Sequence, residues 1–159
     1  MRSRARAGAL LAAAVLLLAL PACGGTHDAD QEKVAEHEGK AADTSTCAAD
    51  AKAVSAPYGG QFPDSWPFPG GSTVYDVEDR GDQGTIVTAI STAPFQQILD
   101  YLNHQVVSAG FRIESGETEE HDAEAEWVGN GHRGRWAIRE SATCPGETVV
   151  QVLAAEGTD

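Results

Sequence analysis

Positive charge is scarce in this chain. It has 11 lysine and arginine residues against 24 aspartate and glutamate residues, for a formal net charge of −13. Binding to nucleic acid needs clustered lysine and arginine, and adhesion to anionic lipid headgroups needs a polybasic segment. The charge balance therefore argues against both, and the sequence predicts no nucleic-acid partner.

Motifs for catalysis and for cofactors are missing as well. The sequence has no Gly-x-Ser-x-Gly, no Ser-x-x-Lys, no His-Glu-x-x-His and no phosphate-binding loop. Its three cysteines include no Cys-x-x-Cys pair, so a zinc ribbon and thioredoxin-like chemistry have no support. We therefore predict no catalytic residue, no metal ligand and no cofactor.

No apolar run is long enough to span a membrane. The longest, at 8–20, has 13 residues, whereas a helix needs about 20 to cross the hydrocarbon core. Arg2, Arg4 and Arg6 precede this run. A short basic segment followed by a short apolar run is typical of a signal peptide.

The apolar run ends in the tetrapeptide Leu20-Pro21-Ala22-Cys23. This segment resembles the lipobox of bacterial lipoprotein signals, which has leucine at position −3, a small residue at −1 and an obligatory cysteine. Pro21 departs from the usual small residue at −2. The resemblance covers residues 1–25 and implies lipid on Cys23, which would anchor the protein on the extracytoplasmic side of the cell membrane. The alternative is an ordinary secretory signal cut after Ala22, which would leave Cys23 as a thiol.

The interpretation of Cys23 as a lipidation site also affects what is expected of the two remaining cysteines. Lipid on Cys23 leaves Cys47 and Cys144 as a pair, and a compartment outside the cytoplasm permits a disulfide between them. Such a bond would close a loop of about 100 residues and contribute up to about 4.7 kcal/mol in the chain-entropy model. The alternative is two separate buried thiols.

Composition divides the chain into three parts. We predict a signal peptide at 1–22, a polar acidic tether at 23–56 and a single domain at 57–156. The tether has few large apolar side chains to offset the entropy of ordering it. Its expected role is to hold the domain away from the membrane surface.

An arm rich in proline and aromatic residues opens the domain at 57–71. Its four prolines exclude a helix or a central strand. Its aromatic residues are Tyr58, Phe62, Trp66 and Phe68. One interpretation is an irregular arm that covers a face or edge of a sheet; the alternative is an aromatic ligand surface.

The rest of the domain predicts an α+β fold, with a mainly antiparallel sheet of about five to six strands and one helix packed on one face. The expected order is β-β-α-β-β-β-β. Two strands rich in β-branched residues precede the helix, at 73–77 and 85–90. Thr92 is the expected N-cap of the helix, with Pro94 in its first turn, and Gly110 is the expected stop.

A hairpin accounts for much of the acidic run between residues 114 and 126. Asn130-Gly131 is a type I′ turn signal. Folding the chain there places opposite charges together on one face and large residues beside small ones on the other. The charged pairs are Glu126 with Arg135 and Asp122 with Arg139; the packed pairs are Trp127 with Gly134, Ala125 with Trp136 and Ala123 with Ile138. The alternative for the acidic run is a weak calcium site, although it lacks the glycine and ligand order of an EF-hand.

These features predict a membrane-anchored lipoprotein of the cell envelope that acts as a non-enzymatic binding or interaction module. Its ligand or partner, protein or small molecule, is not specified by the sequence. The alternatives are a hydrolase-like envelope enzyme with a site assembled from distant residues, and a weak calcium-binding domain. A pocket holding a perturbed carboxylate or histidine would favour an enzyme, whereas an exposed aromatic patch would favour a partner surface.

Overall fold

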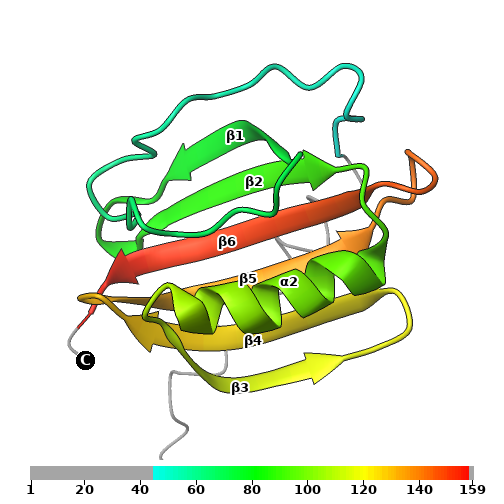
Figure 1. Cartoon of the computed structure of the whole chain (residues 1–159). Helices are drawn as coiled ribbons and strands as arrows, with labels where there is room; N and C mark the ends of the chain where they lie inside the picture. The colour runs from blue at the N-terminus through cyan, green and yellow to red at the C-terminus, as the bar shows by residue number, and fades with distance from the viewer. Residues whose placement is uncertain (1–44, 158–159) are drawn as a thin grey trace, which may run out of the picture.

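The computed structural model describes residues 45–157, which form one six-stranded antiparallel sheet with one α-helix on one face (Figure 1). The elements, in chain order, are β1 (Thr73–Asp79), the short 3-10 helix η1 (Gly81–Gln83), β2 (Thr85–Ser91), α2 (Phe95–Ser108), β3 (Arg112–Thr118), β4 (Asp122–Gly129), β5 (His132–Glu140) and β6 (Thr148–Glu156). In the sheet the strands lie in the order β1-β2-β6-β5-β4-β3. The α+β fold and the order of elements predicted from the sequence are confirmed.

The β4–β5 hairpin has the predicted register. Gly129 pairs with His132 across the turn, and Asn130 and Gly131 have φ angles of 55° and 76°. Positive φ at both central residues is the geometry of a type I′ turn, which matches the right-handed twist of the two strands. The charged and the packed pairs all stand opposite each other as predicted.

Gly134 is required by the packing inside this hairpin. A Cβ at this position would overlap the carbonyl oxygen of Leu153 and lie 2.7 Å from Cζ2 of Trp127. The absent side chain leaves room for the Trp127 ring, which is 1 % exposed. Large-beside-small pairing therefore follows from the space that each pair of facing positions shares.

The N-terminus of α2 differs from the prediction. Its N-cap is Pro94, not Thr92, and the Pro94 carbonyl accepts hydrogen bonds from the backbone N–H groups of Gln97 (2.9 Å) and Ile98 (3.2 Å). Thr92 was a wrong choice because a residue that precedes proline is driven out of the helical region. Ala93 precedes Pro94, so Ala93 cannot be the first helical residue, as a cap at Thr92 would require. Pro94 itself has ψ 146° and lies outside the helix.

The helix α2 ends at Ser108, and Gly110 follows its C-cap, Ala109, as the predicted stop. Gly110 has φ +94° and its N–H donates to the carbonyl of Val107 (3.1 Å). The N–H of Phe111 donates to the carbonyl of Val106 (3.2 Å). These two bonds form a Schellman motif, which needs a residue at positive φ after the last helical turn.

The aromatic arm belongs to the core. Phe62 and Trp66 are 4 % and 6 % exposed. The Trp66 ring lies 4.6 Å from that of Trp127 and 5.2 Å from that of Phe111, measured between centroids. The structure thus supports the interpretation of a covering arm, because these rings pack against the same face of the sheet as α2.

The last strand is longer than expected. The sequence predicts strand up to residue 153 and a frayed tail from Glu156, whereas β6 continues to Glu156. Its neighbours on both sides explain the extension, since β6 pairs with β2 through Ala154 and with β5 through Glu156. Pairing on two sides satisfies the backbone groups that a free tail would leave to water.

Candidate functional site

The predicted cysteine pair is joined at one end of the sheet. A disulfide links Cys47 and Cys144, whose Cα atoms lie 5.6 Å apart. Cys144 lies in the middle of the loop between β5 and β6, where the Glu147 N–H donates to the Cys144 carbonyl (3.1 Å) and Gly146 has φ +83°. The Cys-Pro-Gly-Glu turn thus presents one sulfur to a segment far earlier in the chain.

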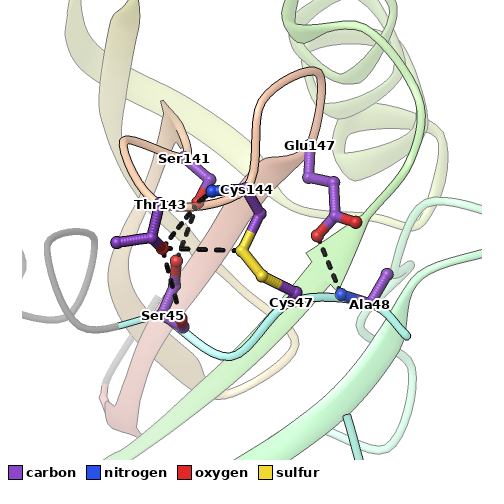
Figure 2. The surroundings of a disulfide bond; sticks show 7 residues. All are labelled: Ser45, Cys47, Ala48, Ser141, Thr143, Cys144 and Glu147. Atoms are coloured by element: carbon purple, nitrogen blue, oxygen red, sulfur yellow. Dashed lines mark hydrogen bonds between the residues drawn. A yellow bond between two sulfur atoms is a disulfide. The ribbon is translucent and has the colours of Figure 1, made fainter. Parts of the chain in front are cut away.

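Polar contacts surround this disulfide, and together with it they form what we call the disulfide junction (Figure 2). The Ser45 and Ser141 hydroxyl oxygens lie 3.0 Å apart. On the other side of the sulfurs, the backbone N–H of Ala48 donates to Oε2 of Glu147 at 2.8 Å. A covalent bond and these hydrogen bonds fix residues 45–48 to the β5–β6 loop. The chain therefore joins the domain at a defined point.

A tyrosine connects this junction to β1. Tyr75 lies at an irregularity in the β1–β2 pairing and hydrogen-bonds to the backbone of Thr46. Burial raises the pKa of Tyr75 above its ordinary value of 10.0; the bond to Thr46 acts in the opposite direction, and the nearby charge of Asp76 adds to the rise. The neutral phenol is therefore the form that the fold favours.

One group of metal-ligand side chains stands out among residues 45–157. Ligand atoms of Cys47, Cys144 and Glu147 all lie within 4.8 Å of one another. Both sulfurs are bonded in the disulfide, and the Glu147 carboxylate accepts the hydrogen bond from Ala48. In the oxidised protein this group therefore crosslinks residues 45–48 to the β5–β6 loop.

The acidic run forms a charged face of the sheet. Arg139 contacts Asp122 at 2.7 Å, as the register predicts. Arg135 stands opposite Glu126, as predicted, and it also forms an ion pair with the diagonal neighbour Glu124, at 3.1 Å. A long guanidinium can reach the diagonal neighbour on a twisted sheet. The acidic side chains of β4 therefore face the arginines of β5 across the two strands.

A shallow groove opens at the other end of the sheet. It is an open hollow of about 500 Å³ beside the β4–β5 turn. Its lining residues are Pro57, Gly59, Gly60, Phe62, Pro63, Asp64 and His132. No local pattern in the sequence predicts this groove, because the arm and the start of β5 are far apart in the chain and only the packed arm brings them together.

The orientation of His132 limits what the groove can do. Its Nδ1 lies 2.9 Å from the carbonyl oxygen of Asn130. Since a carbonyl only accepts, Nδ1 carries the hydrogen and Nε2 of the neutral ring is an acceptor. A histidine that acts as a general base is usually oriented by a carboxylate at its second nitrogen. Here the backbone carbonyl of Asn130 takes that place.

The proposed lipidation site, Cys23, lies outside the described residues. Within the part of the chain that the structure covers, no helix combines the length and the apolar character needed to cross a bilayer.

Comparison with known proteins gives no relatives: no family model, curated protein or solved structure matches the chain. Function must therefore be argued from the residues and from their arrangement.

Proposed function

We propose that this chain is a lipoprotein of the cell envelope, anchored through Cys23, whose folded part is a non-enzymatic binding or interaction module. The observation that carries the proposal is the segment Leu20-Pro21-Ala22-Cys23 at the end of a short apolar run behind three arginines. Two or three acyl chains exceed the single chain that gives only marginal membrane attachment.

The disulfide supports an extracytoplasmic location. Disulfides persist outside the cytoplasm and are rare in reducing compartments. With Cys47 and Cys144 joined, Cys23 is the one cysteine of the three that remains for lipid. Lipid on Cys23 and the disulfide between Cys47 and Cys144 would thus account for all three cysteines of the chain.

The geometry supports display of the groove away from the membrane. The disulfide junction lies beyond the end of β5, whereas the groove includes His132 at its start. A nine-residue strand is about 30 Å long. The tether would therefore join the domain at one end of the sheet, and the groove would lie at the opposite end.

The first experiment tests the anchor. Cys23→Ala is expected to abolish acyl labelling and to release the protein from the membrane fraction. The matched control is the double variant Cys47→Ala/Cys144→Ala, which keeps Cys23 and should keep both the label and the membrane. Membrane retention of an unlabelled Cys23→Ala protein would overturn the proposal.

A second experiment addresses the non-enzymatic part. The support for a non-enzymatic module is that the sequence carries none of the common hydrolase motifs. Purified protein should show no hydrolysis of generic ester and phosphate substrates above background. Activity that is lost in His132→Ala would contradict this and favour the hydrolase alternative.

A further inference from the structure

We propose that the outer edge of β3 binds an extended, lysine- or arginine-bearing segment of a partner protein, which adds to the sheet as a further strand. This inference rests on the proposed role as an interaction module and names the surface and the class of partner. Strand addition uses the backbone groups of an edge strand for affinity, and neighbouring side chains provide selectivity.

The sheet has two edges, and they differ. Beside β1, the backbone N–H of Val54 donates to the carbonyl of Val74 at 2.8 Å, and the chain before the arm runs along this edge (Figure 1). No residue between 45 and 157 hydrogen-bonds in this way to the outer edge of β3. Every residue of β3 is exposed except Ile113, which is half-buried. An edge of this kind is a template for another strand.

The part of the β3 edge that follows the irregularity between Ile113 and Ser115 is open to a backbone. The Ser115 hydroxyl donates to Oε2 of Glu126 at 3.0 Å, which draws its side chain over β4. Gly116 has no side chain, and a Cβ there would lie 2.7 Å from the carbonyl oxygen of Glu124. An incoming strand therefore meets no bulky side chain at the centre of β3.

Charge selects the partner. Glu114 and Glu117 lie on β3, and Glu119 and Glu120 follow it. Arg112 is the cation of this strand, and it is bonded to Glu114 at 2.8 Å. Residues 45–157 carry 17 acidic and 6 basic side chains, so a second copy of the chain would be repelled. A basic segment would be attracted.

One cross-strand pair adds a specific reason for a cation. Glu117 stands opposite Glu124 in the β3–β4 register. Like charges in directly opposite positions destabilise a sheet, and Arg135 offsets part of the charge on the Glu124 side of this pair. A lysine or arginine on an added strand beside Glu117 would offset this repulsion.

The probe for the test is a blocked heptapeptide with the sequence TKVKVKT, added to the purified full-length chain. It is expected to bind, to slow amide hydrogen exchange across β3 and to bind more weakly as salt is raised. Glu117→Lys should weaken binding about fivefold. This variant faces Glu124 with an opposite charge, so its fold should be retained.

The control variant is Asp82→Lys, which makes the same change of charge in the exposed connection between β1 and β2. It should leave the affinity unchanged. The proposal is overturned if the acidic peptide TEVEVET binds equally well, if the peptide protects other amides but not those of β3, if no peptide binds, or if β3 mediates dimerisation. Acyl labelling of Cys23 is read separately, so failure of the anchor and failure of this surface remain distinguishable.

Discussion

The two faces of the β4–β5 hairpin differ in how they hold the molecule together. On the side of α2, Trp127 and Trp136 are each 1 % exposed. On the other side, the side chains of Glu124 and Asp122 keep 34 % and 33 % of their surface exposed. Buried apolar area contributes about 25 cal/mol per Å², whereas exposed ion pairs contribute at most about 1 kcal/mol each. The same strands therefore gain most of their stability on one face and much of their register specificity on the other.

The largest expected effect lies on the aromatic face. Trp136→Ala should lower the free energy of unfolding by about 3–5 kcal/mol, because the surrounding core cannot collapse fully into the space of an indole ring. Urea denaturation followed by circular dichroism measures this. The control Val107→Ala, at a helix position that is 54 % exposed, should cost less than about 0.5 kcal/mol. An equal loss of unfolding free energy in the two variants would contradict the conclusion that the aromatic face provides most of the stability.

Removal of the disulfide is expected to have the second largest effect on stability. Cys47→Ala/Cys144→Ala should lower the free energy of unfolding by about 2–4 kcal/mol, mainly by freeing the unfolded chain. The aromatic face is expected to keep the domain folded without it. A reductant should lower the melting temperature of the wild type but not that of the variant. If the two proteins respond equally to reductant, the disulfide does not stabilise the fold.

On the charged face, Arg135→Glu should cost about 1–2 kcal/mol, between the values for exposed and for buried ion pairs. The Arg135 side chain is 10 % exposed, and the new carboxylate would lie beside Glu124. Glu124→Arg in the same chain should restore more than half of the loss, while Glu156→Arg should restore none. Rescue by Glu126→Arg alone would show that the directly opposite pair matters more than the diagonal one.

A smaller effect is expected at high pH. The pKa of Tyr75 is raised in the folded protein, so the unfolded chain loses this proton first. The free energy of unfolding should then fall as the pH rises above 10.0, the ordinary tyrosine value, through the raised folded pKa. Tyr75→Phe should flatten this dependence in urea titrations at several alkaline pH values. An unchanged slope would mean that another group causes the loss.

Calcium is expected to have no effect on the melting temperature. Addition of about 100 μM Ca²⁺ should not shift the melting temperature, because the carboxylates of the β4–β5 face are spread along strands beside arginines. A clear stabilisation that disappears in Glu120→Ala or Asp122→Ala would instead support the calcium-binding alternative.

Local patterns in the sequence were sufficient for much of the fold. The Asn130-Gly131 turn and the alternation of large, small and charged residues predicted the hairpin register residue by residue. Gly110 predicted the end of α2. The start of α2 differs from the prediction, because Pro94 keeps its predecessor out of the helical region and this constraint outweighs the preference of threonine for N-caps. The signal segment, with Cys23, remains a prediction from the sequence.

What the sequence determined by itself was local: the turns, the period-2 strands, the end of the helix and the order of elements. Their cause is the conformational preference of neighbouring residues, which acts over a few positions of the chain. The tertiary structure decided that β6 lies between β2 and β5, that the aromatic arm is core, that Arg135 reaches Glu124 and that His132 shares a groove with the arm. These outcomes join residues far apart in sequence, and they depend on which apolar faces can be buried together, which no local pattern encodes.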